Sequence, residues 1–565
     1  MIDTEAMRGR VASVGRSAFR SLLRSPFQGL QGKSVVVEQL LLSPRDLRTA
    51  DPSFATEIYH HQFGLAGTVA VTGSESPFTV RPPSPAWERQ LHGFGWLRHL
   101  SAAGDEISRE HARALVGDWL RLHAKPGGRM WEPELVGRRV ISWLSHSRIF
   151  LEGAEQRFYE DVMEGLTRQI RYLYARHADA KPGQPHLTAL AALIFAELCT
   201  EESFSGTSGA VRLFTEELDR QILSDGGHIS RNPMSLIDIL LDLLPLRQCF
   251  VARDRPPPAP LIGAIDRIMP MIRFFRLGDG ALTRFNGGTA TPTDNLASVI
   301  AHDDAQGEPL VLAQQSGYCR LAHGETIVII DCGHPPPAAV SQRAHAGCLG
   351  IEMSVGRYPV IINCGAPARS NVDWRQAARA TAAHSALVMS DTSSAQMRSC
   401  GTNMFGQEEY TISGPANVMA KLDDVDGVQT LRASHDGYDS RFGITHTRRL
   451  GLSASGDTLT GEDMLIAPHG LKNAAKSSLG AFAIRFHLHP GVKSELSSDQ
   501  RTAILTLPNG QKWRFSSRSG GLTLEESVYL ADNRGPRRTM QIVLYGQLGE
   551  APEIKTDWIL ERGGV

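Results

Sequence analysis

Two histidines and an asparagine fall within one strand-rich block of the sequence, residues 341–385. At residues 349–355 apolar side chains recur at every second position, which is typical of a strand with one buried face. The apolar, β-branched segment 358–363 follows after Gly356 and Arg357. This order predicts a β-hairpin with its turn at the glycine.

The hairpin is expected to gather the chemically active side chains of this block. His345 precedes its first strand, Asn363 ends its second strand, and His384 precedes a strand-like segment at residues 386–389. An imidazole, an amide and a second imidazole are therefore expected to meet at the open ends of the strands. Histidine is the side chain that most often transfers protons in catalysis, so the block is a candidate functional site.

The same block resembles the signature of the heparinase II/III-like polysaccharide lyases. That family shows His-x-His-x-Asp, then an apolar strand ending in Asp-x-Gly, then Thr-Ala-Ala-His-Asn. The corresponding positions here read Arg343-Ala-His345-Ala-Gly347, Asn363-Cys-Gly and Thr-Ala-Ala-His384-Ser. The resemblance implies that His345, Asn363 and His384 occupy the family's metal positions, usually filled by zinc, and that Arg343 replaces a catalytic histidine.

Zinc is the one cofactor that the resemblance implies. Two imidazole nitrogens and a neutral amide oxygen hold a dication less strongly than the family's set, because a carboxylate ligand contributes negative charge. A metal-free, hydrogen-bonded cluster of His345, Asn363 and His384 is the alternative.

The activity implied by the resemblance is cleavage of an acidic, uronate-containing polysaccharide by β-elimination. Such an enzyme offsets the carboxylate charge, removes the proton at C5 and protonates the departing oxygen. By the same resemblance, His186 matches a family histidine at a helix start, and His228 and Arg231 match a Gly-Gly-His motif. Arg231 is expected to grip a carboxylate with two parallel hydrogen bonds. Helix capping and loop packing are the alternatives for these residues.

Ser235 stands where the family has its proton-transferring tyrosine, and Tyr438 is the predicted substitute. Many strand tyrosines only cover core edges, which is the alternative for Tyr438. Trp374 and Arg375 lie between two of the resembling motifs, and with Arg343 they form the predicted substrate-binding set. The proposed catalytic set is His186, His228, Arg231 and Tyr438.

Two function classes follow from these residues. The first is a polysaccharide lyase. The second is a catalytically altered glycan-binding or polysaccharide-biosynthesis accessory protein, since Pro185, Ser235 and Arg343 replace three family catalytic residues. Hydrolysis by paired carboxylates is a third class, for which the sequence offers no compelling Asp/Glu pair.

The amino-acid composition limits which classes of molecule the protein is expected to bind. The 565 residues are 41% hydrophobic and 21% charged with a net charge of -1, which excludes general disorder and disfavours nucleic acid. The seven cysteines form an odd set without Cys-x-x-Cys spacing, typical of buried free thiols. No run of 18 apolar residues and no export signal are visible, so we expect a soluble, cytoplasmic protein, with a periplasmic one possible only by family analogy.

The secondary structure expected to position these residues changes from helices to strands along the chain. Residues 1–30 are expected to be a basic arm. Apolar residues at helical spacing predict helices at 108–123, 136–149, 158–173, 186–199, 209–223, 235–248 and 261–275. From residue 280 onward short β-rich segments alternate with turn residues, as in an antiparallel sandwich. The resemblance implies an α + β multidomain fold, with an incomplete (α/α) toroid at 31–278 and an antiparallel β-sandwich at 279–565.

Overall fold

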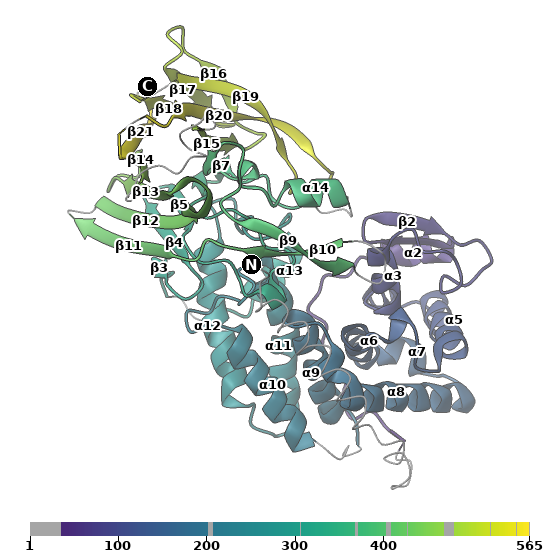
Figure 1. The fold of residues 1–565 in the computed structure, drawn as a ribbon. Helices are drawn as coiled ribbons and strands as arrows, with labels where there is room; N and C mark the ends of the chain where they lie inside the picture. The colour runs from purple at the N-terminus through teal and green to yellow at the C-terminus, as the bar shows by residue number, and fades with distance from the viewer. Residues whose placement is uncertain are drawn as a thin grey trace.

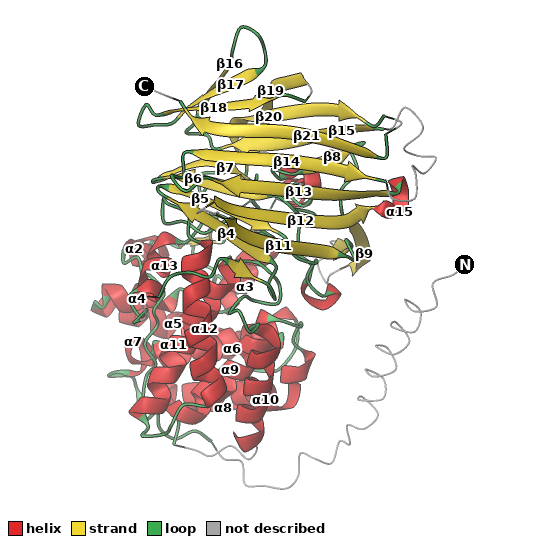
Figure 2. Ribbon diagram, turned by 90° about the vertical axis from the view of Figure 1, so that its left-hand side faces the viewer, coloured by secondary structure: helices red, strands yellow, loops and turns green. Residues whose placement is uncertain are grey.

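A computed structural model describes residues 36–201, 207–304, 307–367, 371–402, 408–425, 428–467, 480–519, 521–549 and 551–563. Helices make up the N-terminal half of the described chain and strands the C-terminal half, and the two halves are stacked on one another (Figures 1 and 2). The predicted basic arm at 1–30 lies outside the described residues.

The helical half forms a curved array of mostly antiparallel neighbours. Its helices are α2 (Ser53–Tyr59), α3 (Pro85–His92), α4 (Leu97–Ala103), α5 (Glu106–His123), α6 (Pro133–Ser145), α7 (Ser147–Leu151), α8 (Gln156–Arg176), α9 (Gln184–Cys199), α10 (Thr207–Gln221), α11 (Met234–Ala252), α12 (Ala259–Phe275) and α13 (Thr293–Ile300). A short hairpin of β1 (Gln62–Leu65) and β2 (Thr68–Val71) joins α2 to α3. None of the helices in the described ranges is both long and apolar enough to cross a membrane.

Two kinds of helix build this half. The predicted stripe on α8 is confirmed, since Val162, Leu166, Ile170 and Leu173 are all buried on one face. In contrast, α9 is apolar on all sides and packs against α6, α8, α10 and α11, as expected for a helix at the centre of an array. Its first turn follows Gly183, whose φ of 87° favours glycine.

The C-terminal half is a sandwich of two antiparallel sheets. The eight-stranded sheet runs β11 (Val418–Val425), β12 (Val428–Tyr438), β13 (Ile444–Leu452), β14 (Thr458–Ile466), β21 (Glu553–Arg562), β18 (Lys512–Ser517), β17 (Thr502–Thr506), β16 (Lys493–Leu496). The nine-stranded sheet runs β19 (Gly521–Tyr529), β20 (Arg537–Gln547), β15 (Ala481–Leu488), β7 (Tyr358–Ile362), β6 (Ile351–Val355), β5 (Thr326–Asp331), β4 (Tyr318–His323), β3 (Leu312–Ala313), with β8 (Leu387–Met389) also on β15.

The predicted hairpin is confirmed as β6 and β7, which pair with Val355 opposite Tyr358 across the Gly356 turn. Every residue of β6 is buried, so the alternating pattern of the sequence underestimated its burial. The polar residues Glu352 and Ser354 face neighbouring protein groups instead of solvent. A second small hairpin, β9 (Gln396–Thr402) with β10 (Glu408–Ser413), extends from the sandwich toward the helices (Figure 1).

The two halves share a hydrophobic core. The cluster that fills the helical array also includes Ala313, Tyr318 and Ile329 from the sandwich, while a separate cluster lies between the two sheets. The predicted domain boundary at residue 279 falls before α13, which packs against α11 and therefore joins the helical half. A continuous core means that side chains from both halves are held in fixed relation where they meet.

Candidate functional site

His345 and His384 meet as the sequence predicted. Nδ1 of His345 lies 3.2 Å from Nε2 of His384, whose own Nδ1 donates to the carbonyl of Ala380 at 2.9 Å. Because that donation places the His384 proton on Nδ1, its Nε2 accepts from the Nδ1–H of His345. Burial lowers the pKa of His384 to about 4. Burial also holds the pKa of His345 well below its ordinary value, and His384 lowers it further.

Asn363, the third predicted metal ligand, turns its amide away from this pair. Its Oδ1 accepts from the backbone N–H of Ser385 at 3.0 Å, and its Nδ2 donates to Glu352 at 3.2 Å. A Cβ at Gly347 would lie 2.6 Å from the His384 ring, so the imidazole fills the space that a side chain there would need. Across the described residues no three His, Cys, Asp or Glu side chains are grouped to hold a metal. Of the three residues predicted as ligands, only His345 and His384 contact each other, and zinc binding stays a prediction.

Buried charges from the other sheet hold this histidine pair in place. Arg448 donates to the carbonyl oxygens of Leu349 and Ser385 at 2.7 and 2.9 Å, and it pairs with Asp463 through two nitrogens. Asp463 also accepts from His446 at 2.8 Å and from Trp558 at 3.0 Å. The side chains of Arg448 and Asp463 are fully buried, so the loops around His384 are fixed by an ion pair that water cannot screen.

We expect His384 to stay neutral down to about pH 5, because its folded pKa lies well below the roughly 6.5 of a free imidazole. The folded state then binds fewer protons than the unfolded state, so acidification from about pH 6.5 toward pH 4 should lower the free energy of unfolding by roughly 3 kcal/mol at this residue. NMR titration of the His384 ring protons, compared with urea unfolding of His384→Gln across the same range, measures both effects. A ring that titrates near its ordinary pKa contradicts this expectation.

His186 lies at the first turn of α9, as predicted, and it has a partner that the sequence did not reveal. Its Nδ1 lies 3.3 Å from Oε2 of Glu217 on α10, and its Nε2 lies 3.4 Å from Nδ1 of His177. Burial would raise the pKa of Glu217, but hydrogen bonds from His186 and Gln221 outweigh it and lower the pKa. The His186 side chain is 21% exposed, whereas Glu217 is 4% exposed, so the imidazole faces solvent with an anion behind it.

His228 is a buried link rather than a group that faces solvent. Its Nε2 lies 3.0 Å from Oε1 of Gln221, which itself donates to Glu217, and its Nδ1 accepts from the Ser230 side chain at 2.6 Å. Burial lowers the pKa of His228 to about 4. Both ring nitrogens are thus occupied, which contradicts the predicted direct role of His228 in proton transfer.

Arg231 contradicts its predicted contact with a substrate carboxylate. Its five N–H groups all donate within the protein: to the carbonyl oxygens of Ser316, Gly317, Gly333 and His334, and to Oδ1 of Asp331 at 2.6 Å. Burial would lower the pKa of Arg231, but the Asp331 carboxylate outweighs it and raises the pKa. Arg231 comes from the helical half and its partners from the sandwich, so it joins the two halves.

Tyr438 is also not a substitute for the missing tyrosine. Its side chain is fully buried in the sandwich core, and its hydroxyl donates to the carbonyl of Leu387 at 2.7 Å. Burial raises the pKa of Tyr438 above its ordinary value, so a phenolate is disfavoured there. The alternative that strand tyrosines cover the core is confirmed for this residue.

The predicted substrate-binding residues lie at the surface. Arg343, Trp374 and Arg375 are exposed, with Trp374 on α14 (Val372–Ala377) at 38% exposure. Burial and the positive charge of Arg343 lower the pKa of Arg375. The loop that carries Arg343 is held by the buried Arg379, which donates to the carbonyl oxygens of Ser341 and Ala344.

A pocket of about 600 Å³ opens in the helical half beside the start of α9. Its lining comes from the chain around α2 to α4, from α6 and from the first turn of α9: Asp51, Phe54, Gly64, Leu65, Arg89, Gln90, Gly93, Gly95, Trp96, Arg98, His99, Glu134, Leu135, Arg138, Gln184, Pro185 and Thr188. The same end of α9 meets the sandwich, because a Cβ at Gly183 would lie 2.9 Å from Val340 and Lys181 pairs with Glu409 at 2.8 Å.

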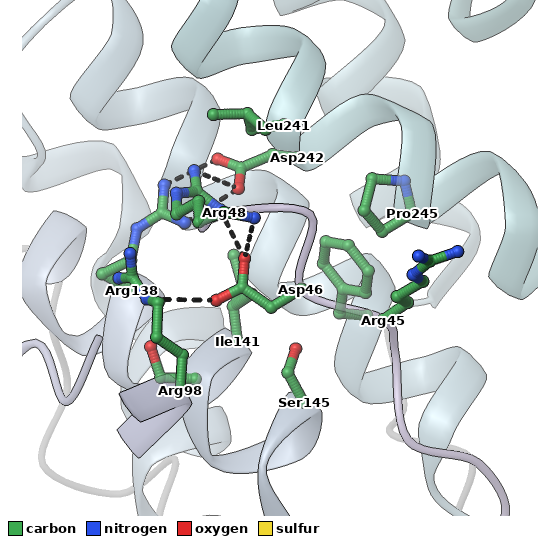
Figure 3. Close-up of a pocket in the computed structure, with 12 residues that line it drawn as sticks. Arg45, Asp46, Arg48, Arg98, Arg138, Ile141, Ser145, Leu241, Asp242 and Pro245 are labelled. Atoms are coloured by element: carbon green, nitrogen blue, oxygen red, sulfur yellow. Dashed lines mark hydrogen bonds and ion pairs between the residues drawn. The ribbon is translucent and has the colours of Figure 1, made fainter. Parts of the chain in front are cut away.

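Below this pocket an ion-pair network fixes Arg98 and Arg138, which line it. Figure 3 shows Asp46 and Asp242 facing these guanidinium groups and that of Arg48. Arg138 grips Asp242 with two nitrogens at 2.8 and 2.6 Å, and Arg98 lies 3.5 Å from Asp46. The network joins the segment before α2 to α4, α6 and α11, so the walls of the pocket are preformed.

Sequence reasoning missed the acidic partners of this region, Glu217, Asp331 and Asp463. The sequence spacing hints at Glu217, because it lies four residues before Gln221 and therefore on the same, buried face of α10. Asp331 ends an apolar strand, and a charge at such a position indicates a buried partner. Asp463 follows Glu462 in a strand of mixed polarity, which gives no such signal. The identity of that partner is not readable from the sequence.

Comparison with known proteins agrees with this architecture. Residues 305–557 match the model of the heparinase II/III-like C-terminal family. FtsZ-localized protein C of Caulobacter vibrioides (strain NA1000 / CB15N) is 32% identical over 533 residues, which cover 93% of this chain and 90% of that protein.

Two crystal structures share the fold along most of the chain. A heparinase III structure has a TM-score of 0.70 at 15% identity, covering 94% of this chain and 88% of that one. A mutant of heparan sulfate lyase HepC from Pedobacter heparinus has a TM-score of 0.65 at 14% identity, covering 92% and 86%. The predicted toroid followed by a β-sandwich is thereby confirmed. With its residues 305–557 matched by the family model and 93% of its length by a relative, the chain belongs to the heparinase II/III-like family.

Proposed function

We propose that the protein binds an acidic polysaccharide where the start of α9 meets the sandwich loop of Arg343, without the tyrosine-dependent elimination of lyases that it resembles. The observation that carries the proposal is the exposed pair Arg343 and Arg375. Within the described ranges neither guanidinium has a hydrogen-bond or ion-pair partner. Two neighbouring cations repel each other, so a bound carboxylate would lower the free energy of both.

The groups that surround this pair also suit a glycan. Trp374 offers an exposed aromatic face beside Arg375, and the pocket of about 600 Å³ lies beside the same end of α9. Sugar-sized sites combine aromatic walls with a few placed polar groups. The family relationship supports a polysaccharide as the polymer.

The loss of tyrosine-dependent elimination is supported by three side chains. Among the described residues, the side-chain hydrogen-bond partner of the Ser235 hydroxyl is the Ser230 hydroxyl at 3.5 Å, and a hydroxyl without a base is a poor proton acceptor. A guanidinium group offers hydrogen-bond donors and no acceptor, so Arg343 cannot replace a catalytic histidine as a base. Tyr438 is enclosed in the core.

The test is calorimetric titration of the protein with uronate polysaccharides and with a neutral glycan as control. Wild type should bind the acidic polymers, and affinity should fall as salt is added. The double variant Arg343→Ala/Arg375→Ala should bind roughly 10- to 100-fold more weakly, because it loses charge-assisted hydrogen bonds. Arg449→Ala, an exposed arginine on β13, is the matched control and should leave affinity unchanged. Equal affinity of wild type and the double variant for the acidic polymers would contradict the proposal.

A second function is supported by the relative whose name associates it with FtsZ. Identity of 32% over 93% of this chain extends through both halves of the molecule. We infer that this chain also localises with FtsZ in its own cell. Imaging of a fluorescent fusion beside labelled FtsZ tests this, and a fusion distributed without relation to FtsZ contradicts it.

A further inference from the structure

The eight-stranded sheet ends in an edge strand, β16, which pairs with β17 alone among the described strands. Figures 1 and 2 both place β16 at the end of the sandwich farthest from the helices. The backbone N–H and C=O groups along the free side of an edge strand can pair with another strand. This end of the sheet is therefore a surface to which a further strand can be added.

The backbone groups of Ser494 and Leu496 point away from the sheet. Ser497 donates its N–H to the carbonyl of Thr502, in register with the pairing of β16 and β17. Because the direction of the backbone groups alternates along a strand, the odd-numbered residues of β16 bond to β17 and the even-numbered residues face outward. Within the described ranges no backbone hydrogen bond reaches these two residues from another segment.

The side chains of β16 carry two unpaired charges and one unpaired hydroxyl. Lys493 and Glu495 are exposed on the outer face of the sheet, where the residues opposite them on β17 are uncharged. Neither forms an ion pair with another described residue. Between them, Ser494 faces the inner side, and its hydroxyl is buried without a hydrogen-bond partner in the described part of the chain. Buried polar atoms are nearly always hydrogen-bonded, so this hydroxyl indicates a partner that the single chain does not supply.

One register of two antiparallel β16 strands brings opposite charges together. Outward-facing residues must lie opposite each other, so the centre of the pair is Ser494 against Ser494, Ser494 against Leu496, or Leu496 against Leu496. In the first register, Lys493 of each copy lies opposite Glu495 of the other. The second register places the two Glu495 side chains opposite each other, and the third places Glu495 opposite the uncharged Ser497. Charge complementarity thus selects the first register.

We propose that two copies of this chain associate by pairing their β16 strands antiparallel, about a two-fold axis at Ser494, which joins their eight-stranded sheets into one. The pairing makes two Lys493–Glu495 contacts at non-hydrogen-bonded positions, where side chains of paired strands lie closest. It also places the two Ser494 hydroxyls opposite each other, within reach of a mutual hydrogen bond after rotation of the side chains. Every contact occurs twice, as a two-fold interface requires. This association goes beyond the proposed glycan binding and does not depend on it.

The same strand limits the choice and the strength of its partner. A lysine and a glutamate on an edge disfavour pairing with strands that lack the complementary charges, so a second copy fits better than an unrelated strand. The strand has four residues, Lys493–Leu496, and an interface of that size is small. We therefore expect monomer and dimer to exchange, with a dissociation constant of roughly 1–100 μM.

Sedimentation velocity of the full chain, over a concentration range that spans this dissociation constant, tests the proposal. Wild type should change from monomer to dimer as its concentration rises, and added salt should weaken the dimer. Lys493→Glu should raise the dissociation constant at least ~10-fold, because it places two acidic side chains opposite each other in both contacts. Glu495→Lys should do the same with two basic side chains. Lys421→Glu, on the exposed face of β11 at the opposite end of the same sheet, is the matched control and should leave the dissociation constant unchanged.

A mixture of the two single variants separates this register from a general effect of charge. Equal amounts of Lys493→Glu and Glu495→Lys chains should form a dimer together, because each contact then joins an acid to a base. The double variant Lys493→Glu/Glu495→Lys should dimerise by itself, for the same reason. Thermal unfolding midpoints equal to that of wild type show that the variants are folded. Wild type that stays monomeric throughout the range, or a Lys493→Glu dimer as tight as that of wild type, overturns the proposal. A mixture that remains monomeric overturns the register at Ser494.

Discussion

Replacement of Arg231 by methionine is expected to lower the free energy of unfolding by about 3–5 kcal/mol. Methionine fills part of the space but removes the five donated hydrogen bonds and leaves Asp331 as a buried, unpaired carboxylate. The carbonyl group of Ser316 loses its donor as well, and a buried acceptor without a partner is costly. Urea unfolding followed by circular dichroism and tryptophan fluorescence measures the effect.

Arg212→Met on α10 is the control for this change. Its ion pair with Glu216 is largely exposed, so its loss should cost at most about 1 kcal/mol. The double variant Arg231→Met/Asp331→Leu should recover part of the lost free energy of unfolding, because it removes the buried carboxylate that Arg231→Met leaves without a counter-charge. A loss for Arg231→Met as small as that of the control would mean that the two halves do not depend on this contact.

Replacement of Asp463 by alanine is expected to cost a similar amount, about 3–5 kcal/mol, in the sandwich. Arg448 would remain fully buried without its carboxylate, and His446 and Trp558 would lose their acceptor. Because Arg448 also holds the carbonyl of Ser385, the ring of His384 should shift from its present position. The free energy of unfolding and the His384 ring resonances report the two consequences separately.

The stabilisation that Asp463 provides is expected to depend on pH in one direction. Burial would raise the pKa of Asp463, but Arg448 and His446 outweigh it and hold the pKa well below its ordinary value. Its stabilisation is thus present above about pH 4 and lost as pH falls through the folded pKa. Asp457→Ala, at an exposed pair with Arg562, is the control and should change the free energy of unfolding by at most about 1 kcal/mol. Unchanged His384 resonances in Asp463→Ala would contradict the link between the two.

Local patterns along the chain predicted the elements well. The spacing of Val162, Leu166 and Ile170 predicted α8, and the β-branched run before Asn363 predicted β7 with its hairpin turn. The pairing of His345 with His384 was also predictable, because the two residues precede strands of one sheet, β6 and β8. These features depend on neighbours within one or two elements, where periodicity carries the information.

The roles of single side chains were predicted less well, since they depend on contacts between distant segments. Arg231 and Asp331 are 100 residues apart in the sequence. Nothing in the sequence around Arg231 indicates that its guanidinium is fully occupied. The prediction for Tyr438 was wrong for the same reason, because the burial of its side chain results from the packing of two sheets.

The sequence by itself determined the order of helical and β-rich halves, the family, and which family catalytic residues are replaced. Those properties follow from local periodicity and from residue types at aligned positions. Only the tertiary structure decided which polar groups have partners within the protein: Arg231, His228 and Asn363 have them, whereas among the described residues Arg343 and Arg375 have none. The physical reason is that a buried donor or acceptor must find a partner, and that partner is supplied by whichever segment folding brings alongside.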